Sequence, residues 1–484
     1  MLFQTMSQLG DTLRGIIEIS DGEIKVIDPG RVRGALIDRL VWTAVFHEKD
    51  EMRGTARWII KMTAPQLGIY LSSIQPLYEA RGRGENKGFT VPAINVRAMS
   101  YDTARAIFRA ANQGEVGAFI LEIAKSEMNY THQSPAEYAA VMTAAAIQEG
   151  FTGPLFIQGD HIQVSAKKYN EDREKELKGI RQLIKDAIAS GFYNIDIDSS
   201  TLVVLERSNV IEQQRDNFEI AADLTAYIRS LEPEGMTISV GGEIGEVGAK
   251  NSTVEEFEVY IDQFLENLQQ KGPKHRGISK ISVQTGTSHG GVPLADGTVA
   301  EVKLDFSVLE KISKVAQEKY GLSGAVQHGA STLPAEVFDR FPETGTSEIH
   351  LATEFQNMVY DRLPAAFREE IYDYLRQACK GERTAEQTDE QFIYKTRKKA
   401  IGPFKKRLWE LPSDLREKIG QALEERFASL FKKLNVTKTR DVVAKTVPPV
   451  GVSFTIRNEI AAAEEESRKA SGPKESEDIN PLAD

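Results

Sequence analysis

Histidines and acidic residues follow several short apolar runs of this 484-residue chain. The chain has seven histidines, and four of them stand where runs that predict strands end: His161, His289, His328 and His350. Buried imidazoles are costly without partners, so four such positions together with Glu243 favour a shared site over isolated core histidines. Imidazoles with a carboxylate suit Zn²⁺ better than Mg²⁺. We therefore predict a site for a divalent metal ion.

The residues beside these histidines could transfer a proton and bind an anion. Asp160 precedes His161, and a carboxylate near a cation could exchange a proton with a substrate oxygen or orient an imidazole. Gly290 and Gly329 follow two other histidines and would let backbone N–H groups approach an anion closely. Ser331 adds a hydroxyl donor. Tight turns alone are the alternative interpretation of these glycines.

The order of apolar and amphipathic segments predicts the fold that would position these residues. The strand-length runs cover Val91–Val96, Ala118–Ile123, Leu155–Gly159, Asn194–Asp198, Thr237–Gly241, Ile278–Gln284, Gly324–Gln327 and Ser347–Leu351. Helical patterns lie between them at Tyr101–Asn112, Ala136–Gln148, Glu174–Ala189, Asn217–Leu231, Val254–Leu268 and Val308–Tyr320. This alternation predicts an α/β fold, a (β/α)₈ TIM barrel whose active site lies at the C-terminal ends of the strands. A doubly wound sheet is less favoured, because Val91–Ser100 has no glycine-rich nucleotide turn.

The segments outside the barrel differ in character. We expect an N-terminal accessory segment over 1–85, with a hairpin around Asp21-Gly22 followed by helices. The barrel would occupy 86–361 and a C-terminal helical arm 362–440. Residues 441–484 are predicted to be an extended to disordered acidic tail. The basic stretch Lys395–Arg407 is either a solvated helix face or a contact for a phosphate.

Composition excludes several classes of protein. The 60 basic and 71 acidic residues give a net charge of −11, which argues against a general binder of nucleic acid or anionic membranes. The single cysteine, Cys379, excludes an intramolecular disulfide and a cysteine-based zinc site. No apolar stretch has the roughly 18 residues of a membrane span, so we expect a cytoplasmic protein.

Several motifs resemble those of the class II, metal-dependent ketose-bisphosphate aldolases, the fructose- and tagatose-bisphosphate aldolase family. The resemblance covers about residues 85–435. It rests on Phe89–Val96, Asp160-His161, Glu243-Ile244-Gly245, Ser288-His289-Gly290 and His328-Gly329-Ala330-Ser331, which occur in the family's order.

The resemblance implies reversible aldol cleavage of a phosphorylated ketose, similar to fructose-1,6-bisphosphate, to dihydroxyacetone phosphate and an aldehyde. It implies one Zn²⁺ per chain, with a monovalent cation as a further option, and a homodimer or homotetramer. The implied metal ligands are His161, Glu243, His289 and His328. The implied catalytic acid–base residue is Asp160. The implied phosphate- and substrate-binding residues are Asn95, Asp198, Gly290, Gly329, Ser331 and Thr353.

The sequence departs from the family pattern at the general base and at strand eight. The loop after the fifth strand lacks the acidic pair that takes the carbon proton, so Glu246, Glu255 and Glu256 are all candidates for that role. His350 stands in place of an asparagine and could donate its hydrogen bond or transfer a proton. Two alternatives therefore stay open: a non-catalytic barrel subunit of a tagatose-bisphosphate aldolase-type complex, and a metal lyase or epimerase acting on an unusual sugar phosphate.

Overall fold

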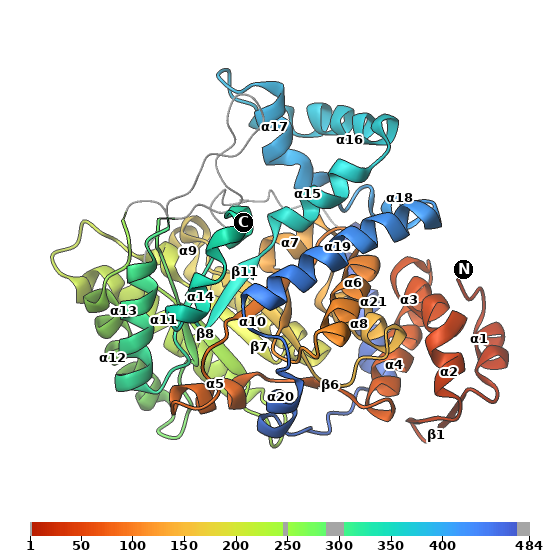
Figure 1. Cartoon of the computed structure of the whole chain (residues 1–484), viewed down its shortest axis with the longest axis horizontal. Coiled ribbons are helices and arrows are strands. Elements are labelled where there is room, and N and C mark those ends of the chain that lie inside the picture. Colours follow the sequence, from red (N-terminus) through yellow and green to blue (C-terminus); the bar gives the residue numbers. More distant parts are fainter. Residues whose placement is uncertain (1, 245–249, 287–303, 472–484) are drawn as a thin grey trace.

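The structure is a computed structural model that describes residues 2–244, 250–286 and 304–471 (Figure 1). Within these residues, eight parallel strands close into a barrel, because β6 pairs with both β5 and β7. The barrel strands are β4 (Val91–Asn95), β5 (Ile120–Ala124), β6 (Gly153–Gln163), β7 (Asn194–Asp198), β8 (Ser239–Glu243), β9 (Lys280–Val283), β10 (Ala325–Gln327) and β11 (Glu348–Leu351). The predicted (β/α)₈ barrel is confirmed.

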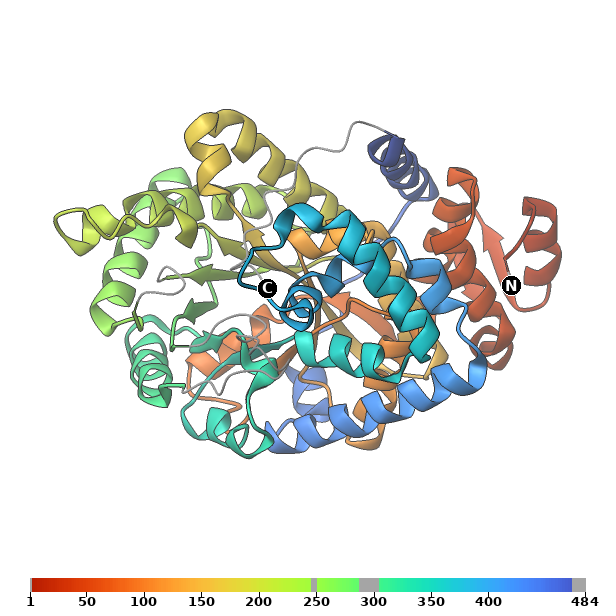
Figure 2. The same ribbon diagram turned by 90° about the horizontal axis from the view of Figure 1, so that it is seen from above.

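Helices follow the strands and form the outer layer of the barrel (Figure 2). In strand order they are α6 (Ser100–Gln113), α8 (Pro135–Gln148), α10 (Arg173–Ser190), α11 (Val210–Ser230), α12 (Val254–Lys271), α13 (Phe306–Tyr320), α14 (Arg340–Glu343) and α15 (Thr353–Arg362). The additional short helices α7 (Lys125–Tyr130) and α9 (Ala166–Glu171) follow β5 and β6. Several of these helices start at a residue whose side chain caps the first turn. At α8, for example, the Ser134 side chain accepts a hydrogen bond from the N–H of Glu137.

The N-terminal segment contributes to the sheet as well as to the surface. It comprises α1 (Met6–Leu13), β1 (Ile17–Ser20), β2 (Glu23–Val26), α2 (Pro29–Arg31), α3 (Ile37–Phe46), α4 (Asp50–Gln66), β3 (Ile69–Ser72) and α5 (Gln75–Gly82). β1 and β2 pair as an antiparallel hairpin around Asp21-Gly22. Phe156 of β6 pairs with Ser72 of β3 on one edge and with Ile120 on the other. Strands β3 and β7 therefore pair with the same edge of β6, β3 near the start of β6 and β7 near its end.

The C-terminal arm begins above the strand ends and returns along the barrel wall. It comprises α16 (Ala365–Ala378), α17 (Asp389–Thr396), α18 (Lys405–Trp409) and α19 (Ser413–Lys433), and α19 packs along α6 (Figure 1). Its basic stretch is held in ion pairs and polar contacts: Lys399 contacts Glu382, and Lys405 contacts Glu137. The alternative of a solvated helix face therefore holds only in part, because Lys406 and Arg407 are exposed while these two lysines contact neighbouring protein groups.

The prediction of an extended to disordered tail over 441–484 is wrong for much of that range. Helices α20 (Arg440–Thr446) and α21 (Ile456–Ser471) form, and α21 packs on α4 (Figure 2). A glycine makes this close packing possible, because a Cβ on Gly54 would lie 2.5 Å from the backbone of Ile460. Residues 472–484 of the predicted tail lie outside the described residues.

Buried ion pairs join these two helices, and we call the four residues Arg57, Lys61, Glu459 and Glu466 the terminal clasp. The Lys61 ammonium lies 2.6 Å from Glu459 Oε1, and both side chains are buried. The Arg57 guanidinium donates to both oxygens of Glu466, at 2.6 and 2.9 Å. Acidic residues of the predicted tail are thus neutralised by basic residues about 400 positions earlier in the chain. The composition of the tail alone does not reveal these partners.

Across the part of the chain that the structure describes, none of the helices combines the length and apolar content that crossing a membrane requires.

Candidate active site

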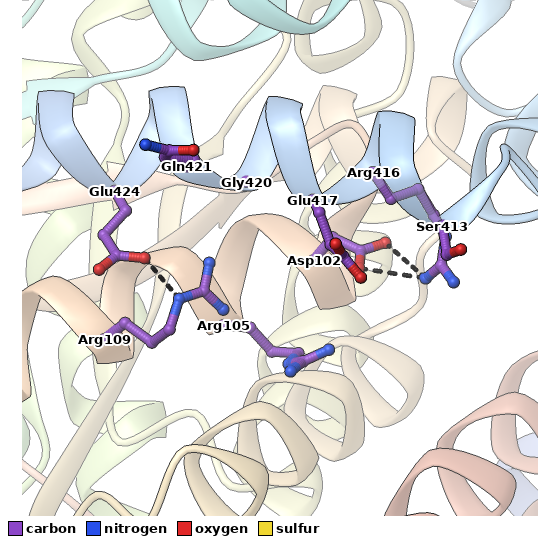
Figure 3. Close-up of a pocket in the computed structure, with 9 residues that line it drawn as sticks. All are labelled: Asp102, Arg105, Arg109, Ser413, Arg416, Glu417, Gly420, Gln421 and Glu424. Atoms are coloured by element: carbon purple, nitrogen blue, oxygen red, sulfur yellow. Dashed lines mark hydrogen bonds and ion pairs between the residues drawn. The ribbon is translucent and has the colours of Figure 1, made fainter.

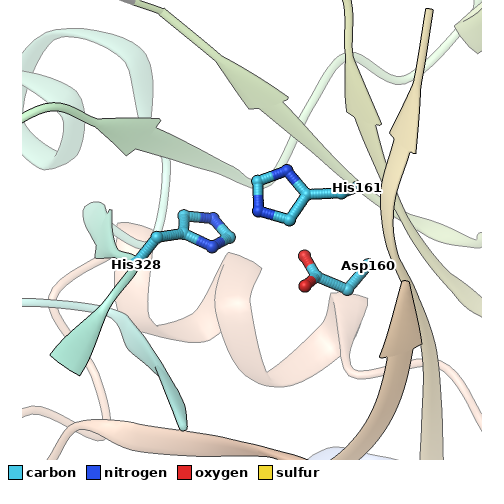
Figure 4. A group of neighbouring side chains, drawn as sticks. All are labelled: Asp160, His161 and His328. Atoms are coloured by element: carbon cyan, nitrogen blue, oxygen red, sulfur yellow. The ribbon is translucent and has the colours of Figure 1, made fainter. Parts of the chain in front are cut away.

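An irregularity in β6 brings two consecutive polar side chains to the C-terminal end of the barrel. Gly159 pairs with Ile195 and Ile162 with Ile197, so β6 carries one extra residue between these pairs. His161, inside this bulge, has a φ of 39°, a left-handed conformation that is rare for a histidine. Side chains in a regular strand alternate between faces, but here Asp160 and His161 both turn toward His328 (Figure 4). Backbone strain of this kind is concentrated at functional sites.

His161 is the centre of the candidate metal site. Its Nδ1 lies 3.2 Å from Asp198 Oδ2 and 3.4 Å from Glu243 Oε2, and its ring centroid is 4.4 Å from that of His328. Potential ligand atoms lie within 4.8 Å of one another in two groups, one with Asp160 and His328 and one with Asp198 and Glu243, and His161 belongs to both. Of the four predicted ligands, His161 therefore lies close to His328 in one group and to Glu243 in the other, but no group among the described residues holds all three. The fourth, His289, lies outside the described residues.

The electrostatics of this group suit a bound cation. Burial disfavours a charged imidazole, but Asp160 and Glu243 outweigh it and raise the pKa of His161 well above its ordinary value. Burial and the charge of Asp198 raise the pKa of Glu243 to about 7. The buried carboxylates are thus balanced by protons on neighbouring groups. Because neutral imidazole and carboxylate are ligands of borderline divalent ions, His161, Glu243 and His328 fit a zinc-type cation that would replace those protons.

Asp160 is ionised in this environment. Burial raises its pKa, but the attraction of His161 and His350 is stronger and holds the pKa well below its ordinary value. Its Oδ1 lies 3.4 Å from His350 Nδ1, and only 4 % of the residue is exposed. The carboxylate can therefore accept a proton at neutral pH.

His350 lies on β11 beside both Asp160 and His328. Its Nδ1 is 2.9 Å from Glu122 Oε2, its Nε2 is 2.9 Å from Glu348 Oε1, and its ring centroid is 4.0 Å from that of His328. Burial opposes its charged form, but Glu122 and Asp160 raise its pKa well above the ordinary value. The neighbouring carboxylates therefore favour the charged form of His350.

The predicted anion-binding segments lie around the same end of the barrel. Gly329 has a φ of +68° and opens a short 3₁₀ turn over Ala330–Thr332, in which Ser331 is buried. Thr353 is the first residue of α15 and is also buried. Gly290 and Glu246 lie outside the described residues, so the structure gives no position for these two candidates.

Two predicted substrate-binding residues are engaged by neighbouring protein groups. The Asn95 amide donates to Glu127 and accepts from Arg97. Asp198 contacts His161 and accepts from Gln163 and from Ser200, which suits a residue that orients an imidazole. Their side chains therefore hold protein groups in place.

The structure also bears on the general-base candidates after β8. Glu256 closes a capping box with Thr253 at the start of α12, and its other oxygen lies 2.8 Å from Lys250. Glu255 is exposed on the same turn. Because its carboxylate is committed to the helix start, Glu256 is a structural residue.

A group of buried polar side chains that was not predicted lies inside the barrel, below the histidines. We call them the lumen cluster: Tyr78, Glu122, Gln158, Asp196, Lys280 and Glu348, each at most 6 % exposed. Its charged members come from β5, β7, β9 and β11, alternate strands that together supply one layer of a barrel interior. A signal was present in the sequence, since four predicted strand runs each contain a charged residue that a wholly apolar interior would not accept.

A shallow depression of about 300 Å³ lies elsewhere, between α6 and α19 on the barrel wall (Figure 3). Its arginines are paired with carboxylates: Arg109 with Glu424, and Arg416 with Asp102. This depression is a set of ion pairs between two helices, and it lies apart from the histidines.

The fold and the site together define a (β/α)₈-barrel protein with a buried histidine–carboxylate centre, fit for a divalent metal, at the C-terminal ends of its strands. The family model described as "Fructose-bisphosphate aldolase class-II" matches residues 78–408, more than half of the chain. The chain belongs to this class II aldolase family, and the predicted resemblance is confirmed.

The chain is also similar to several solved structures of low sequence identity. A probable tagatose 6 phosphate kinase from Sinorhizobium meliloti 1021 is 13% identical with a TM-score of 0.50, covering 78% of this chain and 98% of that one. The YdjI aldolase from Escherichia coli K12 is 15% identical with a TM-score of 0.45, covering 76% and 98%. The fructuronate-tagaturonate epimerase UxaE from Cohnella laeviribosi is 12% identical with a TM-score of 0.48, covering 91% and 90%.

Curated proteins also match the chain, and one of them matches part of it. It is a small ribosomal subunit protein bS1 from a Synechococcus strain, 25% identical over 213 residues. The match covers 44% of this chain and 58% of that protein. The chain thus spans little more than half of that relative's length.

Proposed function

We propose that this protein is a metal-dependent aldolase that reversibly cleaves a phosphorylated ketose to dihydroxyacetone phosphate and an aldehyde. The observation that carries the proposal is the convergence of Asp160, His161 and His328 at the C-terminal ends of β6 and β10 (Figure 4). Membership of the class II aldolase family supports the same reaction type. Zn²⁺ is the ion that the imidazole and carboxylate donors favour.

The residues of the site have complementary tasks in this reaction. The divalent ion, when bound, supplies Lewis-acid stabilisation of the negative charge that develops on the substrate oxygens. In the cleavage direction, the ionised Asp160 accepts the proton of the C4 hydroxyl as the C3–C4 bond breaks, and it returns that proton in condensation. His350, charged and 3.4 Å from Asp160, favours the ionised form of that carboxylate.

The substrate's phosphate is assigned to the turn after β10. The backbone at Gly329, the Ser331 hydroxyl and the first turn of α15 at Thr353 supply N–H and O–H donors. The family description supports a fructose-1,6-bisphosphate-like substrate.

A cleavage screen tests the proposal. The protein, reconstituted with Zn²⁺, is assayed on fructose-, tagatose- and related ketose phosphates with and without a chelator, and bound metal is measured. We expect about one metal ion per chain and cleavage that the chelator abolishes. His328→Ala should lose the metal, whereas His275→Ala, a histidine outside the site, should retain it. No bound metal after reconstitution would refute the proposal.

An epimerase or a related lyase acting on a sugar phosphate is the second candidate, and the pairing of His350 with Asp160 favours it. Two adjacent acid–base groups could remove and return a proton on one substrate. In the same screen this function would appear as isomerisation without release of dihydroxyacetone phosphate. A protein that binds metal but converts no substrate would instead support a non-catalytic barrel subunit.

A further inference from the structure

Glu348 is the hub of the lumen cluster. Its Oε2 accepts a hydrogen bond from the Tyr78 hydroxyl. Its Oε1 lies beside the Lys280 ammonium, 3.0 Å from the Gln158 amide nitrogen and 2.9 Å from His350 Nε2. Glu348 is fully buried. A carboxylate with this many donors has one stable orientation, and its neighbours determine that orientation.

The packing around the ammonium leaves little room for movement. Lys280 Nζ also lies 2.8 Å from Asp196 Oδ2 and donates to the Gln158 side-chain oxygen at 2.8 Å. Gly241, on the neighbouring strand, leaves space for this pair, because a Cβ there would lie 2.3 Å from Asp196 Oδ1 and 2.9 Å from Lys280 Cε. The Lys280–Asp196 pair therefore occupies a space that the backbone of β8 provides.

The two ring nitrogens of His350 contact the carboxylates around it. Nε2 contacts Glu348 below, while Nδ1 contacts Glu122 at 2.9 Å and Asp160 at 3.4 Å. Carboxylates at both nitrogens fix the rotation of the ring and therefore the direction in which it faces Asp160. The arrangement of the ring thus depends on how Glu348 is held.

We propose that Tyr78, through Glu348, is a positioning residue for His350, so that the N-terminal segment takes part in building the active site. Tyr78 lies on α5, before the first barrel strand, and its hydroxyl reaches the charged layer inside the barrel. Without this donor, Oε2 of Glu348 is no longer held, and the carboxylate can rotate relative to His350. The ring then loses the contact that sets its angle to Asp160. The kinetic part of this proposal rests on the proposed function, whereas its structural part does not.

The test compares two tyrosines that differ in what their hydroxyls contact. Tyr78→Phe removes the bond to Glu348. Tyr101→Phe is the matched control, because Tyr101 is equally buried and its hydroxyl also joins the barrel to the N-terminal segment, at 2.8 Å from Asp38 Oδ1, outside the lumen cluster.

The first readout is the side-chain NMR spectrum of the whole chain with isotope-labelled histidine, recorded with and without added Zn²⁺. Only seven histidines contribute signals, and a His350→Gln spectrum assigns the one from His350. Tyr78→Phe should shift the His350 ring signals, and Tyr101→Phe should leave them in place. Gln158→Met, which removes another donor to Glu348, should shift the same signals. Unchanged His350 signals in folded Tyr78→Phe, or equal shifts in the control, would overturn the proposal.

The second readout is steady-state aldol cleavage. Tyr78→Phe should lower kcat about ten-fold, with KM changed less than about two-fold, as for other outer positioning contacts. A drop in both tyrosine variants would indicate a structural role and count against positioning. If the unmodified protein cleaves no ketose phosphate, the proposed function fails, and the NMR comparison alone decides the role of Tyr78.

Discussion

The lumen cluster and the terminal clasp are both buried and both ionic, yet they are built differently. In the clasp, two bases face two carboxylates, and each contact joins one base to one acid. In the lumen cluster, two carboxylates, Asp196 and Glu348, contact the single ammonium of Lys280, and a third, Glu122, contacts His350 instead. The clasp is neutral by itself, whereas the lumen cluster is not.

The protonation of the two regions reflects this difference. Burial raises the pKa of Glu466, but Arg57 reverses the effect and the pKa lies below its ordinary value. In the lumen cluster, burial and the charge of Asp160 raise the pKa of Glu122 to about 8. A region that only joins two segments can be electrically neutral. A region that exchanges protons or holds a cation needs unbalanced charge, and perturbed pKa values are concentrated in such regions.

The largest effect should follow from a change beside the lumen cluster. Asp160→Asn should lower the rate of aldol cleavage by about 10²–10⁴-fold, because the amide cannot accept the hydroxyl proton. Bound metal should remain near the level of the unmodified protein, as measured by elemental analysis. Asp414→Asn, an exposed aspartate on α19, serves as the control and should leave the rate unchanged. Loss of metal in Asp160→Asn would make Asp160 a ligand instead.

A change in the clasp should affect stability instead of rate. Glu459→Gln leaves the Lys61 ammonium buried without its partner and should lower the free energy of unfolding by about 3 kcal/mol. Denaturant titration measures this loss, and the activity of the folded fraction should not change. The double variant Lys61→Met with Glu459→Leu should recover most of the stability. Equal losses in the single and double variants would contradict this account.

The clasp should also weaken in acid. Because the pKa of Glu466 is lowered below its ordinary value of 4.5 on folding, its carboxylate stabilises the folded chain above that pH. This contribution is lost as the pH falls from 4.5 through the folded pKa. Thermal unfolding measured from pH 6 downward should therefore show a steeper decline than in Glu466→Gln. Parallel curves for the two proteins would remove Glu466 from the acid response.

The smallest effect is expected at an exposed pair. Lys418 and Asp414 lie 3.9 Å apart on α19, and each side chain is 75% exposed. Water and salt screen such a pair, and holding two long side chains together costs entropy. Lys418→Met should therefore leave both the unfolding midpoint and the cleavage rate unchanged within error. A clear loss of stability would mean that burial is not what separates the clasp from ordinary surface pairs.

Much of the barrel could be predicted because its strands are short apolar runs between amphipathic helices. The run Asn194–Asp198 coincides with β7, and the other runs overlap their strands. Helix α11 begins at Val210, earlier than the predicted Asn217, because Asn209 caps it, a signal that periodicity alone does not show. The seventh helix is only Arg340–Glu343, too short for a periodic pattern.

The candidate site could be predicted less completely. Asp160, His161 and His328 were recognisable because they follow strands in a family motif. The use of Asp198 to orient His161 could not be predicted, because a contact across β6 and β7 depends on the bulge in β6. The helix α21 was missed for a similar reason, since its acidic residues find their bases on α4.

The amino-acid sequence by itself determined the alternation of strands and helices, the family motifs and the residue types available for chemistry. These depend on local periodicity and on side-chain identity. Only the tertiary structure decided which charges meet: that Lys280 neutralises Glu348, that Tyr78 reaches it from another segment, and that Glu459 is buried against Lys61. The reason is physical, because the free energy of a charge depends on its burial and on partners that are close in space but distant along the chain.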